Sequence, residues 1–210
     1  MSIREAIPTH SAFLELKEER AGMQEGYRFL DEKRLILASE ILTALGQYAQ
    51  DLESFRADYA AAGRVLAAAV ARHGLEGLSV YPPLAGPQGE ARRSERSVLG
   101  VRVQATDWPR AVGPGPESPQ GQQGAEAVDR SPEGDACRIA FAALIPHCVR
   151  LADHAVNLER LRAEYARTAR RARAMEDVLL PEIDATLAAI DTALEELERE
   201  EAVRVRRTRG

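Results

Sequence analysis

Several residue types are scarce in this 210-residue chain, and each scarcity argues against a class of protein. Aromatic residues make up 5% of the chain, and alanine inflates the 45% hydrophobic share, so little material exists for a large globular core. No run approaches about 18 apolar residues, and residues 1–10 lack the apolar core of a signal peptide. We therefore expect a cytosolic protein with no direct membrane insertion.

The chain also lacks an excess of basic over acidic residues and contains only two cysteines. The net charge is -5 and the pI is near 5.5, so no basic excess is present to release counterions from phosphate, and we expect no nucleic-acid partner. Cys137 and Cys148 lie 11 residues apart in a stretch expected to be helical. A disulfide would be geometrically awkward there, so we predict two free thiols.

Motifs that support chemistry are missing as well. The sequence has no glycine-rich phosphate loop, no G-x-S-x-G and no H-E-x-x-H. The nearest candidate metal ligands are Cys137, His147, Cys148 and His154. Adjacent helical side chains point about 100° apart, so one helix cannot easily bring all four to a tetrahedral site. We predict no catalytic residue, no cofactor and no metal, and thus a protein that is not an enzyme in its own right.

What the sequence does contain is a pair of long apolar repeats, at Thr9–His73 and Pro146–Arg207. Apolar residues recur at spacings of three and four, from Met23 to Ala69 in the first and from Leu151 to Leu197 in the second. The mean step is about 3.5 residues, which favours helices that coil around each other with a left-handed twist.

The two segments are of nearly equal length, which indicates how they pair. Only an antiparallel hairpin lets each long helix bury the apolar seam of the other along its whole length. We predict an all-α fold, a long antiparallel two-helix coiled-coil hairpin with a small β-hairpin and disordered insert. The N-terminal helix would occupy residues 1–74, the insert 75–134, and the C-terminal helix with a basic tail 135–210.

The predicted insert changes character along its length. Leu78–Tyr81 and Ser97–Ala105 favour strands, and the Pro and Gly residues between them favour a loop, so a small hairpin is expected. Pro109–Gly134 has the Gly, Pro, Gln and Ser content of a mobile linker. Trp108, at the junction, would anchor the hairpin against the helices or contact a partner.

Local signals predict the helix ends. Thr9 or Ser11 can cap the first helix, and Gly74 suits its C-terminal stop. Asp135 could cap a short segment before Pro146 restarts or kinks the second helix. Pro181 lies inside the second segment, where a proline removes a backbone hydrogen bond, so we expect a bend near Leu180.

Two arginine clusters remain. Arg167, Arg170, Arg171 and Arg173 spread four positive charges around about two helical turns, and part of that ring should face a partner or glutamates of the first helix. Arg204, Arg206, Arg207 and Arg209 close the chain. This tail either balances the helix dipole or enters a partner cavity lined by carbonyls or carboxylates.

Short motifs near both ends of the chain carry a family resemblance. These are Ile7–Ser11, Leu14 with Leu16 and Lys17, Gly26–Arg34, Arg167–Glu176, Val178–Pro181 and Glu198–Glu201. In order and spacing they resemble the two signatures of the D subunit of V-type ATPases, a central rotor stalk.

The resemblance implies a non-catalytic shaft that transmits torque and couples ATP hydrolysis or synthesis to proton or sodium transport. Its partners would be the A and B subunits of the catalytic ring, the F subunit and a connector on the membrane ring, at the cytoplasmic face. The residues that would make rotor contacts or cross-helix pairs are Thr9, Lys17, Lys33, Arg34, Arg170, Arg171, Glu176, Arg204, Arg206 and Arg207, with Pro181 as a structural kink. The alternative is a non-rotary coiled-coil adaptor or a stalk protein of a secretion-type ATPase, which shares the helical pattern.

Overall fold

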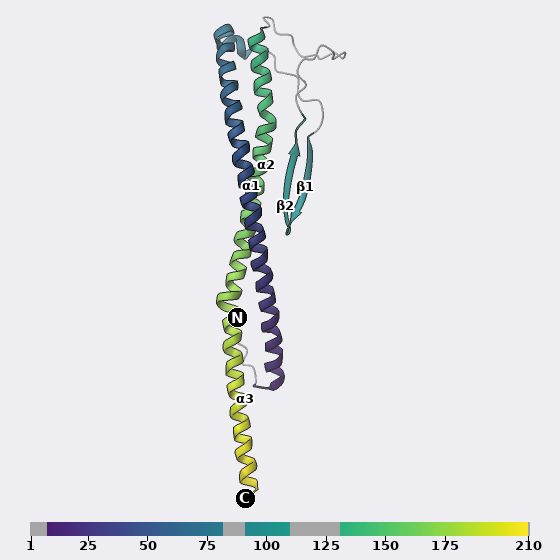
Figure 1. The fold of residues 1–210 in the computed structure, drawn as a ribbon, viewed down its shortest axis with the longest axis vertical. Coiled ribbons are helices and arrows are strands. Elements are labelled where there is room, and N and C mark those ends of the chain that lie inside the picture. The colour runs from purple at the N-terminus through teal and green to yellow at the C-terminus, as the bar shows by residue number, and fades with distance from the viewer. Residues whose placement is uncertain (1–7, 82–90, 110–130, 210) are drawn as a thin grey trace. The chain divides into compact units, whose positions relative to one another are not determined.

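The computed structural model describes residues 8–81, 91–109 and 131–209, and most of them are helical. The elements are helix α1 (His10–Ser79), strands β1 (Arg92–Val98) and β2 (Val101–Asp107), helix α2 (Pro132–Ala174), the π-helical turn η1 (Met175–Leu179) and helix α3 (Leu180–Thr208). Figure 1 labels the three α-helices and the two strands. The prediction of two long helical segments with a small hairpin between them is confirmed.

The chain divides into two compact units, which are described separately. Unit 1 contains residues 1–38 and 163–210, and unit 2 contains residues 39–162. Within each unit α1 runs antiparallel to the C-terminal helical segment. In unit 1, Arg20 pairs with Asp184 and Lys33 with Glu164, so the partner number falls as the α1 number rises.

The start of α1 follows the predicted cap. Thr9 Oγ1 accepts a hydrogen bond from the Ala12 N–H at 3.2 Å, which satisfies one of the free donors of the first turn. Gly74 leaves helical geometry with φ 67°, as its predicted stop role requires, but helical turns resume and continue to Ser79. The prediction of a strand at Leu78–Tyr81 is therefore wrong, because Leu78 and Ser79 are the last residues of the helical segment after Gly74, and Val80 and Tyr81 form a turn beyond it.

The hairpin is present, although its strands differ from the predicted ones. β1 and β2 pair antiparallel from Arg92↔Asp107 to Val98↔Val101, so the predicted strand Ser97–Ala105 contains the turn itself. Leu99 and Gly100 have φ 47° and 89°, the pair of positive values that a two-residue type I′ turn needs. The sequence analysis missed this turn because Leu at the first position hides the usual Asn-Gly or Asp-Gly signal.

Helix α2 begins earlier than predicted. Ser131 Oγ accepts a hydrogen bond from the Gly134 N–H at 3.0 Å and Pro132 occupies the first helical position, so the cap is Ser131 and not Asp135. The helix continues through Pro146 without interruption, which corrects the expected restart there. The rest of the predicted linker, residues 110–130, lies outside the described residues.

The helical backbone changes directly before Pro181. The Leu180 N–H bonds to the Met175 carbonyl, five residues back, and the turn Met175–Leu179 is π-helical. A proline at 181 has no N–H for the carbonyl four residues earlier, and its ring crowds that carbonyl, so a wider turn relieves the conflict. The bend expected near Leu180 stays a prediction.

The helical run Pro132–Thr208 includes an 18-residue window with mean hydropathy 1.3, of which 11% is buried. By length and composition alone this window could cross a membrane, a test that core helices of soluble proteins also pass. The same run carries Asp153 and Asn157, which are 7% and 6% exposed and hydrogen bonded to β2. Through these hydrogen bonds α2 holds the hairpin.

Candidate interaction surfaces

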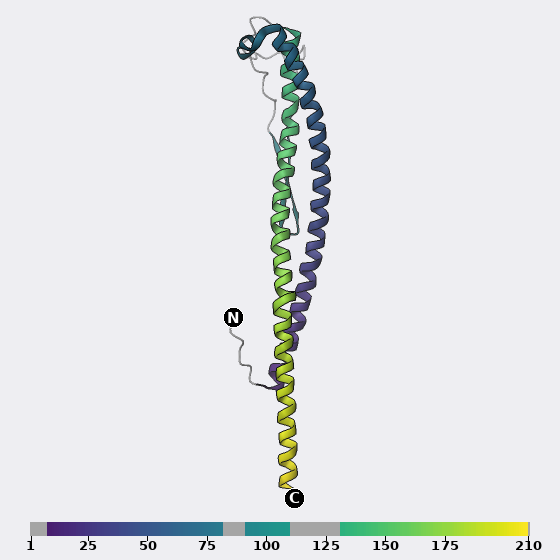
Figure 2. The same ribbon diagram turned by 90° about the vertical axis from the view of Figure 1, so that its left-hand side faces the viewer.

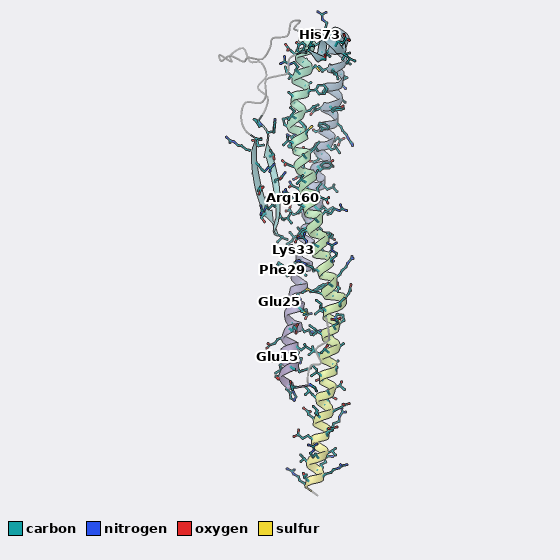
Figure 3. All side chains as sticks on the ribbon, turned by 180° about the vertical axis from the view of Figure 1, so that it is seen from behind. Glu15, Glu25, Phe29, Lys33, His73 and Arg160 are labelled. Atoms are coloured by element: carbon teal, nitrogen blue, oxygen red, sulfur yellow. The ribbon has the colours of Figure 1, made fainter. Side chains whose placement is uncertain are left out.

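Lys33 and Glu164 form the least exposed ion pair between the helices of unit 1. Lys33 Nζ lies 2.6 Å from Glu164 Oε1, and the two side chains are 17% and 18% exposed. The hydrogen bond from Lys33 and, less strongly, the positive charges of Lys33, Arg167 and Arg171 hold the pKa of Glu164 below its ordinary value. Lys33, labelled in Figure 3, was predicted as a rotor contact or cross-helix pair, and in unit 1 it makes a cross-helix pair.

A second pair joins Arg20 to Asp184, and the sequence analysis missed it. The guanidinium donates two hydrogen bonds to the carboxylate, and the side chains are 41% and 50% exposed. The hydrogen bond, reinforced by Coulomb attraction, raises the pKa of Arg20 and lowers the pKa of Asp184. Opposite charges on the two predicted helices were visible in the sequence, but which pairs meet depends on their register.

The π-helical turn packs closely against α1. A Cβ atom added at Gly26 would lie 3.3 Å from Met175 Cε, so glycine gives the methionine room. Burial raises the pKa of Tyr27, with smaller contributions from the hydrogen bond to Glu176 and that carboxylate's charge. Glu176, one of the predicted contact residues, thus meets α1 through Tyr27.

The other predicted residues near the chain start have local partners. Thr9 caps α1, Lys17 lies over the Phe13 ring at 4.7 Å, and Arg34 pairs with Asp31 of the same helix at 2.5 Å. These contacts are short-range along the chain. They leave the exposed Lys17 ammonium available on one side to solvent or to a partner.

The predicted arginines of the C-terminal half remain on the surface. Arg170 and Arg171 are exposed, as are Arg204, Arg206 and Arg207 near the end of α3. The last ion pair between α1 and α3 joins His10 to Glu198 at 3.9 Å among the residues that the structure describes. Beyond it, Val203 and Val205 are 49% and 44% exposed, so the tail presents both charge and apolar area.

In unit 2, three side chains of α2 hold the hairpin. Asp153 accepts hydrogen bonds from the Thr106 N–H at 2.6 Å and from Gln104 Nε2 at 2.8 Å. Asn157 bonds both backbone groups of Gln104: its Oδ1 accepts from the N–H at 2.9 Å and its Nδ2 donates to the carbonyl at 2.7 Å. Arg160 donates to the Arg102 carbonyl at 3.1 Å. β1 and β2 therefore run alongside α2, as Figure 1 and Figure 2 show.

These contacts cover one edge of the sheet. Residues 153, 157 and 160 are spaced four and three apart, so they share a face of α2, and their targets alternate along β2. An edge strand normally leaves such N–H and C=O groups unpaired. β1, with Arg92, Arg93 and Arg96, is exposed except at Val98, and charged side chains are a common protection for such an edge.

The four candidate metal ligands do not come together. His154 lies 2.9 Å from Asp51 and His147 lies 3.6 Å from Asp58, so both imidazoles face α1. Cys137 is partly buried, which raises its pKa, and Cys148 is exposed; both are free thiols, as predicted. In the described parts of the chain no group of three His, Cys, Asp or Glu side chains could hold a metal ion.

Where α1 ends, Tyr81 crosses the first turn of α2. A Cβ atom at Gly134 would lie 2.7 Å from Tyr81 Cζ, so only glycine accommodates the ring. The Tyr81 hydroxyl accepts from the Ser131 N–H at 3.2 Å, and His73 Nε2 lies 2.5 Å from Ser131 Oγ. Beside these residues is an open cavity of about 380 Å³, lined by Leu66, Leu78, Tyr81, Gly134, Cys137, Arg138 and Phe141.

Trp108 is half-buried, and its predicted anchoring role stays a prediction.

The described residues thus define a mostly helical protein of two long antiparallel segments with a small β-hairpin, in which the arginines of the C-terminal half lie on the surface. The family defined by the D subunit of ATP synthase matches residues 12–210, and this chain belongs to that family. The D subunit of the V-type ATP synthase of Anaeromyxobacter dehalogenans is 32% identical in strain 2CP-C and 34% identical in strain 2CP-1, in each case over 98% of this chain and 96% of the relative. The D subunit of the A-type ATP synthase of Thermococcus gammatolerans is 28% identical over 97% of this chain and 92% of the relative.

Proposed function

We propose that this chain is the central rotor-shaft subunit of a V/A-type ATP synthase and transmits torque between a catalytic ring and a membrane ion-translocating ring. The family supports membership of the complex. The observation that carries the rotor reading is the end of α3, where Arg204, Arg206 and Arg207 are exposed beyond the last cross-helix ion pair. Such a segment is free to enter a bore lined by carbonyls or carboxylates of partners.

On this proposal the chain contributes no catalytic residue. ATP chemistry takes place on the A and B subunits, and rotation of an asymmetric shaft gives each interface a different set of contacts in turn. Differential contacts of this kind bias which interface is open or closed, which is the physical requirement for coupling. The F subunit and a connector to the membrane ring would bind elsewhere on the chain, at the cytoplasmic face.

The decisive measurement is the native mass of the chain mixed with the A and B subunits from the same source. A single asymmetric shaft fills a threefold bore only once, so we expect one copy per ring of three A and three B subunits. No binding, or several copies per ring, would contradict the shaft and favour the coiled-coil adaptor.

A second experiment tests the tail. Deleting residues 204–210 should lower ATP-driven ion pumping by reconstituted complexes while the helical circular dichroism of the isolated chain stays unchanged. The matched control replaces Arg204, Arg206 and Arg207 by lysine, which keeps the charge and should retain most pumping. Undiminished pumping after the deletion would leave the tail with only its favourable interaction with the helix dipole.

A further inference from the structure

Within unit 1, α1 presents one face that repeats without interruption. Along it, buried or half-buried residues recur at alternating steps of three and four, and they are Phe13, Leu16, Arg20, Met23, Tyr27, Leu30, Arg34 and Leu37. The mean step is about 3.5 residues, the period of helices that coil around each other. A helix that packs against α1 over this whole stretch has to keep the same period.

The C-terminal run keeps this period on either side of η1 but not across it. Before the turn, the buried or half-buried set is Tyr165, Thr168, Ala172 and Met175, at steps of three, four and three. After it, the set is Leu180, Ile183, Leu187, Ile190 and Leu194, at steps of three, four, three and four. The step from Met175 to Leu180 is five, where the repeat requires four. The run therefore contains one residue more than the face of α1 can match.

Burial follows the shifted count after η1. Continued in steps of four and three from the residues before the turn, the repeat would pass through Leu179, Glu182 and Ala189, which are all exposed. One position further along stand Ile183 and Ile190, which are 9% and 4% exposed. The apolar face of α3 is thus displaced by one residue along the sequence relative to that of α2.

An eleven-residue repeat is the alternative account of this spacing. It is built from steps of three and four alone, and it places three buried residues in one line, Ala172, Ile183 and Leu194. The same repeat would bury Leu179, which stands eleven residues after Thr168 and eleven before Ile190. Thr168 and Ile190 are 2% and 4% exposed, but Leu179 is 38% exposed. The eleven-residue repeat therefore fails at η1.

The extra residue falls at the π-helical turn. In η1 the Leu180 N–H bonds to the carbonyl five residues back, at Met175, instead of four. Such a turn takes up one residue more than an α-helical turn does. Without it, one additional residue would rotate the apolar face of α3 by about 100° about the helix axis relative to that of α2. Pro181 gives a local reason for a wide turn, and the spacing of the buried residues gives a second, independent one.

We propose that the π-helical turn Met175–Leu179 corrects the phase of the C-terminal run, so that the apolar faces of α2 and α3 both meet the single face of α1 in unit 1. The turn is required by the spacing of the buried residues, whereas Pro181 only favours it locally. Gly26 of α1 leaves room for it, because a Cβ atom there would lie 3.3 Å from Met175 Cε. This role is independent of the proposed rotor function, and it is measurable on the isolated full-length chain.

The test removes the extra residue. Deletion of Val178, whose side chain is 48% exposed, leaves the step from Met175 to Leu180 at four. This deletion and its control both carry Pro181→Ala, so that a continuous α-helix meets no proline, and Pro181→Ala alone is the reference. If the turn corrects the phase, the deletion variant forms an uninterrupted α-helix in phase with α1. Its melting temperature, followed by circular dichroism, should equal or exceed that of the reference.

The matched control deletes Ala188, an exposed residue of α3. It removes the same number of residues but leaves three apolar positions out of phase, either Leu180, Ile183 and Leu187 if η1 becomes α-helical or Ile190, Leu194 and Leu197 if it stays. We expect its melting temperature to fall by about 10 °C or more. Hydrogen exchange of the α3 amides should become faster in this control and keep the reference rates in the Val178 deletion.

A melting temperature that falls as far after the Val178 deletion as after the Ala188 deletion would overturn the proposal and leave Pro181 as the cause of the turn. An Ala188 deletion that melts like the reference would also overturn it, because the phase of α3 would then not matter. Should the Val178 deletion fail to fold, deletion of Asp177, another exposed residue of the turn, takes its place. Failure of both deletions to fold would overturn the proposal as well.

Discussion

Units 1 and 2 are each built from a stretch of α1 and a stretch of the C-terminal helical run, yet they use different polar contacts. Unit 1 relies on long side chains that span the two helices, as in Lys33–Glu164 and Arg20–Asp184. Unit 2 also has charged pairs between its helices, such as His154–Asp51, and in addition α2 holds β2 through short side chains bonded to backbone, those of Asp153 and Asn157. Long side chains tolerate small displacements of a helix, whereas an amide bonded to both groups of one residue tolerates almost none. The comparison teaches that the hairpin of unit 2 is held by short side chains bonded to backbone, whereas the polar contacts between the helices of unit 1 are made by longer side chains around a buried apolar seam.

The largest loss of stability should come from a change that breaks α1 inside unit 2. Leu52→Pro removes a backbone hydrogen bond and an apolar contact, which costs about 3 kcal/mol or more of unfolding free energy. A thermal melt followed by circular dichroism would show it as a loss of helical signal or a large drop in melting temperature. Leu52→Ala is the control for the side chain alone, and an unchanged melt in the proline variant would contradict the expectation.

A smaller effect is expected at the tight contact between Tyr81 and α2. Gly134→Ala places a Cβ atom 2.7 Å from the Tyr81 ring, so the ring must move and its hydrogen bond with the Ser131 N–H weakens. We expect a loss of about 1–3 kcal/mol in chemical denaturation. Gly63→Ala is the matched control, because nothing lies within 4 Å of its Cβ position and alanine favours helix by up to about 1 kcal/mol. Equal effects in both variants would refute the contact.

Next in size is the attachment of the hairpin to α2. Asn157→Ala leaves both backbone groups of Gln104 without their protein partner, at a cost of about 1–3 kcal/mol. Hydrogen exchange of the Gln104 and Thr106 amides should become faster, while amides of α1 in unit 1 keep their rates. Arg160→Ala removes a single, more exposed bond and should change the same rates less. Unchanged exchange at Gln104 would contradict the attachment.

The smallest effect concerns pH and belongs to unit 1. Because the folded pKa of Glu164 is lowered, its pairing with Lys33 stabilises the chain fully above the ordinary glutamate pKa of about 4.3 and loses this effect as pH falls through the lower folded value. Denaturant titrations at pH values from 7 to 3 measure the free energy of unfolding. Its total loss over this range should be smaller in Glu164→Gln, by an amount on the order of 1 kcal/mol. Glu196→Gln, at an exposed position, serves as control, and parallel curves for all three proteins would exclude the effect.

Much of the fold could be predicted because its causes are local. The spacing of apolar residues predicts the long helices, Thr9 caps α1 where its hydroxyl can reach the Ala12 N–H, and Pro181 follows an irregular turn. The errors arose where two local signals compete. Leu78–Tyr81 has strand propensity but begins inside the last turn of a helix, and Asp135 is a good cap residue that Ser131 precedes. Propensity alone does not rank such neighbours, because the contacts of Tyr81 with Ser131 decide where α2 starts.

The candidate contact residues show the same division. Arg204, Arg206 and Arg207 could be recognised from the sequence as a basic tail, and they are exposed. For Lys33 and Arg34, adjacent in the chain, composition gives no reason to expect that one pairs across unit 1 and the other within α1. Arg20 was missed for the same reason, since an isolated arginine on a helix carries no sign of its partner.

By itself, therefore, the sequence determined two long helical segments, a cap for the first of them at Thr9 or Ser11, two free thiols and the family to which the chain belongs, since each depends on short-range periodicity, on local residue types or on motif order. Only the tertiary structure decided that Lys33 meets Glu164, 131 positions away, and that Asp153 and Asn157 form hydrogen bonds with the backbone of β2. The physical reason is that such pairings depend on the register between distant segments, which a one-residue or one-repeat displacement changes without altering any local preference.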